Sequence, residues 1–474
     1  MEKNSIHNQH LLWRAGFGPA VEQLPDLSRF TPKQYFASLQ KASAGTPIPL
    51  DVIPSTLKEE MGNPMTGRRK ELTAEERKQR QQLSREGIRQ LNLTWMYAMI
   101  NSSEQLREKM AFFWHGHFAC RTQNLVHQQQ LINIIREKGL GNFGDLLRAV
   151  SQSGAMINFL NNQQNRKDHP NENFAREVME LFTMGRGHYT EKDIKEAARA
   201  FTGWSALPSG EFIFRRFQHD TGVKTILGRK GNFQGEDVLQ LLLEQKETAR
   251  FITRKLWRFL VNDTPDESKI EKLASNFYQS GYQIMPLLES IFLSDWFYTP
   301  RYIGSLIKSP VELIVGFRRM VPLELQREEA VLLLQRALGQ VLFYPPNVAG
   351  WPGGKNWIDS SSLLLRMRVP LLLTSADEFN IGAKDDDDVM MGLGKRGEVF
   401  LQLVGATTNW DLFFSALKNT TRDKLPGIIQ TYLLQTPVRK GSDLIIPFAD
   451  QRSRESFIRS YALHVMSMPE YQLC

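Results

Sequence analysis

Apolar residues recur along most of this chain at intervals of three and four, which is the spacing of one buried face of an α-helix. Residues 249–260 and residues 174–182 follow this spacing. Strict alternation of apolar and polar residues is scarce, and residues 212–217 are the best candidate for a short strand. The pattern predicts a mainly α protein, a multi-helix globular bundle with long loops and little β structure.

Capping signals predict where several helices begin. In a capping box, a Ser or Thr side chain binds the amide three residues later, and a Glu or Gln there reaches back. Thr31 before a proline is a related signal, because proline suits the first helical position. The box spacing occurs at Thr73 with Glu76, Ser102 with Gln105, Thr264 with Glu267, and Ser309 with Glu312.

Two loop-like stretches divide the chain. A charged, loop-rich insertion spans about residues 44–90, and residues 382–397 hold a run of aspartates at 385–388. That run lacks the spaced ligands and the turn glycine of a calcium loop, so we predict a solvated loop. We therefore expect a motif-bearing helical body over residues 1–375. Residues 376–474 would add a loop and a C-terminal helical part packed on that body as one unit.

Composition narrows the class of protein. Hydrophobic residues make up 41% of the 474 residues and charged residues 23%, which is typical of a folded protein and excludes a disordered one. The net charge of +8 favours an anionic ligand but is too mild to indicate nucleic acid, and a protein partner stays open. Cys120 and Cys474 alone cannot form a disulfide framework or a cysteine zinc site.

The hydropathy profile bears on location. No stretch approaches the roughly 18 uninterrupted apolar residues of a membrane span. The first residues also lack the apolar run of a secretory signal. The sequence as written therefore predicts a cytoplasmic protein without a transmembrane segment, and export remains open if the chain is a processed precursor.

A histidine pair at His115 and His117 is the first candidate site. Side chains two residues apart point the same way only on extended backbone, and the intervening Gly116 permits such a backbone after a helix. Histidines with this spacing are common metal ligands. The alternative is an aromatic-rich turn in which both rings form hydrogen bonds to carbonyl groups.

A second candidate lies on the helix predicted over residues 173–182. Asn173, Glu177 and Glu180 fall on one side of it, and Glu177 lies at the border of the apolar face. A carboxylate at such a border needs a partner, which could be an arginine, a histidine or a cation. Ordinary helix pairs with Arg176 are the alternative.

The doublet His219-Asp220 comes next, and the following Gly222 indicates a turn. The doublet could be a pair of metal ligands, or Asp220 could orient His219 as a general base, with Lys224 nearby. Residues 228–235 are rich in glycine. They lack the Gly-Lys-Ser/Thr of a phosphate loop, so an ordinary glycine turn is favoured there.

Residues 344–357 form a loop rich in proline and glycine that carries Trp351 and Trp357. The two indoles could stack on a sugar ring or a base. Alternatively, the loop lies across the helices as a lid that its aromatic rings hold in place.

Together these motifs resemble a bacterial family catalogued as domain of unknown function 1800. The resemblance implies a single extended helical architecture and supplies no activity, cofactor or catalytic residue. One departure is Asn161, where the family pattern leads us to expect an aspartate. The matching runs are residues 10–18, 113–118, 171–185, 189–204, 219–225, 235–237, 248–259, 308–312, 345–357 and 469–472.

The leading hypothesis from the sequence is a metal-assisted hydrolase or transferase that acts on an anionic or glycan-like substrate. The alternative is a non-enzymatic assembly or binding protein, for a glycan or a protein partner, whose polar motifs are structural. In the enzyme hypothesis a divalent metal is bound by His115, His117, Glu177 and His219. Glu180 transfers a proton, Asp220 orients His219, Arg176 and Lys224 stabilise negative charge, and Asn173, Trp351 and Trp357 contact the substrate.

Overall fold

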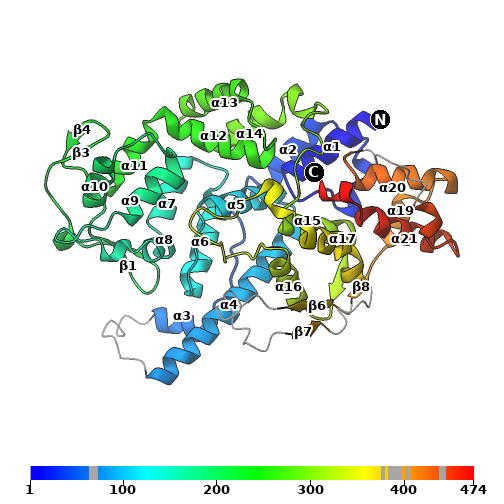
Figure 1. Cartoon of the computed structure of the whole chain (residues 1–474), viewed down its shortest axis with the longest axis horizontal. Helices are drawn as coiled ribbons and strands as arrows, with labels where there is room; N and C mark the ends of the chain where they lie inside the picture. The colour runs from blue at the N-terminus through cyan, green and yellow to red at the C-terminus, as the bar shows by residue number, and fades with distance from the viewer. Residues whose placement is uncertain (1, 63–72, 375–378, 383–397, 402–405, 437–444) are drawn as a thin grey trace.

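The computed structural model describes residues 2–62, 73–374, 379–382, 398–401, 406–436 and 445–474 (Figure 1). Within these ranges, helices pack around one large apolar core, and each strand is only three or four residues long. The predicted mainly α class is therefore confirmed. None of the described helices is both long enough and apolar enough to cross a bilayer.

The first part of the chain supplies the helices around the motif-bearing segments. In chain order they are α1 (Glu2–Arg14), α2 (Pro32–Ala42), α3 (Ser55–Gly62), α4 (Ala74–Asn101), α5 (Gln105–His117), α6 (Leu125–Lys138), α7 (Phe143–Ser151), α8 (Gly154–Phe159), α9 (Asn173–Glu177) and α10 (Glu191–Ala200). A π-helical turn, Val178–Thr183, continues directly from α9.

The later helices are α11 (Gly235–Leu243), α12 (Lys246–Leu260), α13 (Glu267–Gln279), α14 (Ile284–Phe292), α15 (Pro310–Met320), α16 (Glu329–Ala337), α17 (Ser360–Thr374), α19 (Asp411–Ala416), α20 (Leu425–Leu433) and α21 (Arg454–Met466). Helix α12 packs on α13, α5 on α6, and α4 on both α15 and α16.

The described strands form four antiparallel pairs. These are β1 (Trp204–Ala206) with β2 (Phe212–Phe214), β3 (Lys224–Ile226) with β4 (Arg229–Gly231), β5 (Leu323–Leu325) with β8 (Ala406–Thr408), and β6 (Phe379–Gly382) with β7 (Glu398–Leu401). The strand candidate at residues 212–217 is confirmed in its first half, β2. Leu227 and Gly228, at φ of 49° and 78°, make the turn between β3 and β4. Of the glycine turn predicted over residues 228–235, only Gly228 lies in this turn, because residues 229–231 pair as β4 and Gly235 begins α11.

The capping predictions are confirmed at three helix starts. The side chain of Thr31 accepts from the amide of Gln34 at the start of α2. Thr73 and Ser309 form full capping boxes with the glutamates three residues later, at the starts of α4 and α15. Local hydrogen bonds that the sequence spells out thus fix these helix ends.

Two capping predictions are wrong. Helix α5 begins at Gln105 instead of next to Ser102, because the Gln105 amide group donates to the carbonyl of Ser102 and so holds the chain in a turn. Helix α13 is capped by Asp266 instead of Thr264, since its carboxylate accepts from the amide of Lys269 at 3.2 Å. Asp is at least as good an N-cap as Thr, so the closer acid prevailed.

The C-terminus lies beside the end of α1, where Arg14 donates to the carbonyl of Cys474 (Figure 1). Leu306 and Cys474 exchange two backbone hydrogen bonds, of 3.1 and 2.8 Å. Helix α3 and the first half of α4, which belong to the insertion at residues 44–90, extend away from the other helices in Figure 1. The boundary near residue 375 and the aspartate run at 385–388 lie outside the described residues, so the domain division stays a prediction.

Candidate functional site

His115 and His117 lie inside helix α5, so the prediction of an extended backbone is wrong. On a helix, residues two apart point about 200° away from each other. Gly116 continues the helix instead of breaking it, because glycine tolerates helical backbone angles as well as extended ones. The two imidazoles therefore face different neighbours and do not form a chelating pair.

His115 is a buried hydrogen-bond acceptor. Its Nε2 accepts from the backbone amide of Phe343 at 3.2 Å. Its ring packs against Trp95 and Trp351, with centroids 5.2 and 5.6 Å away. Burial lowers the pKa of His115 to about 3, so the ring is neutral. The alternative of an aromatic-rich turn is not formed here either, because His115 lies in a helix and accepts from an amide instead of donating to a carbonyl group.

His117 faces the π-helical turn. Its Nε2 lies 3.2 Å from the carbonyl oxygen of Phe182, which can only accept, so Nε2 carries the hydrogen. Its Nδ1 consequently accepts from Nζ of Lys255 at 3.2 Å. Lys255 also donates to the carbonyl of Leu181 at 3.2 Å. His117 and Lys255 together bind carbonyl groups at the end of this turn, where a helix leaves them unpaired.

The acidic pair of the π-turn region lies near the surface. Glu180 accepts from Arg186 and, at 2.7 Å, from the hydroxyl of Tyr189. Burial, reinforced by the charge of Glu180, raises the pKa of the half-buried Glu177. Arg176 does not pair with either; it holds Glu191 through two bonds of 2.7 and 2.8 Å.

The His219-Asp220 doublet lies in a turn, as the sequence indicates, but its side chains diverge. Asp220 forms two hydrogen bonds with Arg199 and accepts the amide of Gly222 at 2.7 Å. Nδ1 of His219 donates to the carbonyl of Thr202 at 2.9 Å. Asp220 therefore does not orient His219 here, because the arginine is the stronger partner for its carboxylate.

Two further predicted residues bind backbone. Nζ of Lys224 is buried and donates to the carbonyls of Asp220 and Gly222 at 2.5 and 3.0 Å. The side-chain amide of Asn173 donates to the carbonyl of Leu160 at 3.2 Å. Both side chains therefore fix loops in this structure.

The predicted divalent-metal site is not assembled. Across the described ranges, no three His, Cys, Asp or Glu side chains gather closely enough to hold a metal ion. His115, His117, Glu177 and His219 thus do not surround a common point.

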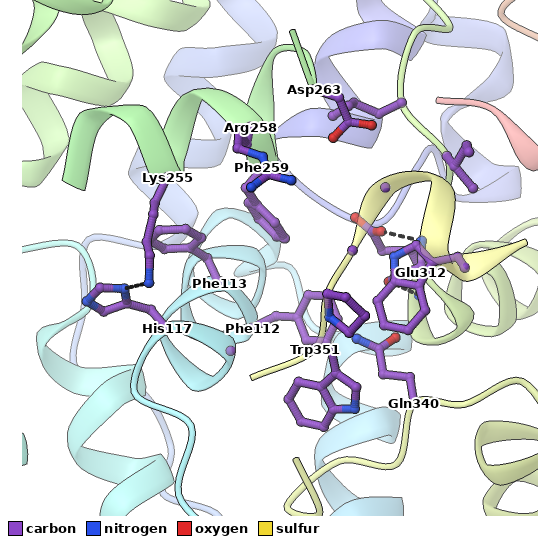
Figure 2. Close-up of a pocket in the computed structure, with 18 of the residues that line it drawn as sticks. Phe112, Phe113, His117, Lys255, Arg258, Phe259, Asp263, Glu312, Gln340 and Trp351 are labelled. Atoms are coloured by element: carbon purple, nitrogen blue, oxygen red, sulfur yellow. Dashed lines mark hydrogen bonds between the residues drawn. The ribbon is translucent and has the colours of Figure 1, made fainter. Parts of the chain in front are cut away.

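A cavity of about 340 Å³ lies where α5, α12 and α15 meet the loop of residues 344–357, and we call it the Trp351 pocket. Figure 2 shows Lys255 and His117 at one end of it and Glu312 and Gln340 at the other. Its wall is mainly aromatic and charged. The side chains used below are Arg14, Lys109, Phe113, His117, Lys255, Arg258, Phe259, Asp263, Glu312, Trp351 and Trp357.

A buried ion pair closes one side of the pocket. Nζ of Lys109 contacts Oε1 of Glu312, and their side chains are 2% and 9% exposed. Burial alone would raise the pKa of Glu312, but Lys109 and the hydrogen bonds from Ser309 outweigh it and lower that pKa. Because Lys109 is paired with Glu312, it adds no net positive charge to the wall.

Arg14, the last residue of α1, is almost completely buried in the same wall. Its Nη2 donates to the carbonyls of Tyr302 and Cys474 and to the hydroxyl of Ser305. Its Nε and Nη1 have no hydrogen-bond partner. These two nitrogens are inaccessible to solvent, so the guanidinium contributes its positive charge to the pocket and offers no free donor there.

Lys255 and Arg258 lie one turn apart on α12 and both line the pocket. Burial first, and the charge of Arg258 second, lower the pKa of Lys255 to about 8. With Arg14 they are three cations that the ion pair does not neutralise. Asp263 is the remaining carboxylate among the side chains of the wall, so the pocket carries excess positive charge.

The loop that carries Trp351 is held close to α5. Gly350 has a φ of 82°, and a side chain there would collide with the carbonyl oxygen of Gly116. Trp351 is half-buried against His115, and Trp357 is buried in the pocket wall. This is the arrangement of a loop held in place by its aromatic rings, and one face of it borders the cavity.

Of the predicted site residues, His117, Trp351 and Trp357 therefore line one pocket, and His115 supports it from behind. The other predicted residues do not line it. The sequence reading missed Arg14, Lys109, Lys255, Arg258 and Glu312. One signal was available: Lys255 falls among the apolar positions of residues 249–260, where an ion needs a partner or a function.

Comparison with known families agrees with the resemblance seen in the sequence. A family model described as "Protein of unknown function (DUF1800)" matches residues 10–473, nearly the whole chain. The chain belongs to this family. No curated protein and no solved structure matches it significantly. The matched range includes every residue named for the Trp351 pocket except Cys474.

Proposed function

We propose that this protein binds a small anionic ligand in the Trp351 pocket. The observation that carries the proposal is the surplus of basic side chains in the wall: Arg14, Lys255 and Arg258 lie outside the Lys109–Glu312 pair, and Asp263 is the remaining acidic side chain. Anions are attracted to such a site because its low dielectric strengthens each charge.

The aromatic part of the wall adds shape to this preference. Trp351, Phe113 and Phe259 offer flat faces beside the cations, and a cavity of about 340 Å³ is in the range of small-molecule sites. An anionic or glycan-like compound, the ligand class expected from the sequence, would place its acid group on the cations and its ring or chain on these faces.

The metal-assisted hydrolase or transferase hypothesis needs four ligands around one metal, and the described residues offer no such group. Our proposal therefore concerns binding at the pocket and assigns no metal to it. A reaction on the bound anion would have to use the groups of the pocket itself.

A ligand screen tests the proposal. Phosphate, citrate and pyruvate are titrated while tryptophan fluorescence and thermal stability are followed, since two indoles line the cavity. We expect at least one anion to bind, and Arg258→Gln to weaken it about tenfold through the loss of a charge-assisted hydrogen bond. Arg254→Gln is the matched control, because Arg254 lies on the same helix but pairs with Glu267.

Two results would overturn the proposal. One is the absence of binding by every anion in the screen. The other is equal weakening by Arg258→Gln and Arg254→Gln, which would show that general surface charge and not the pocket attracts the anion.

A further inference from the structure

The amine of Lys255 is placed as a reactive group within the Trp351 pocket. Its side chain is half-buried and lines the cavity, and its Nζ lies 4.9 Å from the centre of the Phe251 ring. Its partners are the neutral Nδ1 of His117 and the carbonyl of Leu181, and among the described residues no carboxylate offsets its desolvation. A desolvated lysine without a carboxylate partner is suited to nucleophilic attack.

A cation stands beside this amine. Arg258 follows Lys255 by three residues on α12, so both side chains project on the same side of the helix. Arg258 is exposed at the cavity and forms no ion pair among the described residues, in contrast to Arg254 on the same helix. Its guanidinium is free to bind a carboxylate through two parallel hydrogen bonds.

We propose that Lys255 forms an imine with the carbonyl carbon of a small 2-oxo acid whose carboxylate binds Arg258. This inference rests on the proposed function and names the class of the anion. Both residues lie on α12 and line the same pocket, with the amine turned toward His117 in Figure 2, and a small ligand that carries both a carbonyl and a carboxylate could engage the two groups.

The Lys255 ammonium releases one proton to solvent, which frees its lone pair. The amine nitrogen then bonds to the carbonyl carbon, and the carbonyl oxygen takes up two protons and leaves as water. The product is a protonated imine, and ammonium plus carbonyl has become iminium plus water with no change in oxidation state. Burial favours the step, because it holds the pKa of Lys255 near 8 and so increases the neutral fraction near neutral pH.

Borohydride trapping tests the inference. The full-length protein is incubated with pyruvate or glyoxylate, reduced with sodium borohydride, digested and mapped by mass spectrometry. We expect a reduced adduct on Lys255 and its loss in Lys255→Met, while Lys246→Met retains it, since Lys246 is exposed at the start of the same helix. The yield should rise with pH through about 8, as the neutral amine becomes the main form.

The carboxylate is tested separately. At a pH well above about 8, where the Lys255 amine is neutral with or without the charge of Arg258, Arg258→Gln should lower the yield with pyruvate about tenfold and leave the yield with acetone, which lacks a carboxylate, unchanged. Adducts spread evenly over surface lysines, or the absence of any adduct on Lys255, would overturn the inference. Because the adduct is mapped in the wild-type protein, these outcomes decide the inference even if Lys255→Met fails to fold. If anions still bind in the titration while no adduct forms, only this inference fails and the proposed function stands.

Discussion

The ion pair between Lys109 and Glu312 offers the sharpest test of how the pocket wall is held together. In Lys109→Met, a side chain of similar length fills the space, but Glu312 loses its charged partner in a site where both groups are at most 9% exposed. Stranding one member of a buried pair costs about 3–5 kcal/mol. The carbonyl of Trp13 also loses the donor that Lys109 supplies at 3.0 Å, which adds about 1 kcal/mol.

The double variant Lys109→Met/Glu312→Gln removes the stranded charge. Glutamine keeps the capping box with Ser309, because its side-chain oxygen can still accept from that amide. The expected loss then falls to about 1–2 kcal/mol, the cost of the unpaired carbonyl and of a weaker cap. The surface pair Arg254 with Glu267, at 39% and 62% exposure, is the control, and Glu267→Gln should cost less than about 1 kcal/mol.

Urea unfolding followed by far-ultraviolet circular dichroism at pH 7 measures these differences in the free energy of unfolding. The pH dependence of the free energy of unfolding provides a second test. In the wild type, the pKa of Glu312 lies below 4.5, so its contribution is present above that pH and is lost as the pH falls further. In Lys109→Met, burial raises that pKa instead. The deficit should therefore be largest near neutral pH and shrink as the pH falls toward 4.5. The reasoning is refuted if the double variant loses as much free energy of unfolding as Lys109→Met and Glu312→Gln lose together when each is measured alone.

Two other predictions concern the loop and the discarded doublet. Gly350→Ala should destabilise the protein by about 1–2 kcal/mol and weaken anion binding, because it strains a φ of 82° and pushes the loop away from α5. The control is Gly353→Ala, which has a similar φ but open space around its Cα, and it should cost about 1 kcal/mol and leave binding unchanged. Equal effects of the two variants on binding would contradict this prediction. Asp220→Asn should cost about 1–3 kcal/mol at pH 7, because it breaks the paired hydrogen bonds with Arg199. This loss of stability should become smaller as the pH falls through the lowered pKa of Asp220. Anion affinity should stay unchanged, and a large loss of affinity would show that the ligand binds at the His219-Asp220 doublet instead of the Trp351 pocket.

The sequence by itself determined the local features of this protein. The three-and-four spacing of residues 249–260 requires a helix with one apolar face, and α12 is that helix. Ser309 with Glu312 spells out its own helix start through hydrogen bonds three residues apart. Family membership, too, was readable from motifs in chain order. These features depend on neighbours within one or two turns, which is why pattern alone suffices.

Only the tertiary structure decided which polar groups meet. His115 and His117 were expected to act together, but packing kept them on a helix, where they point apart. Asp220 bound Arg199 in preference to the adjacent His219. Conversely, Arg14 and Lys255 come from distant helices and share one pocket. No period in the sequence links such residues, because their proximity follows from how whole helices pack and from which buried charges find partners.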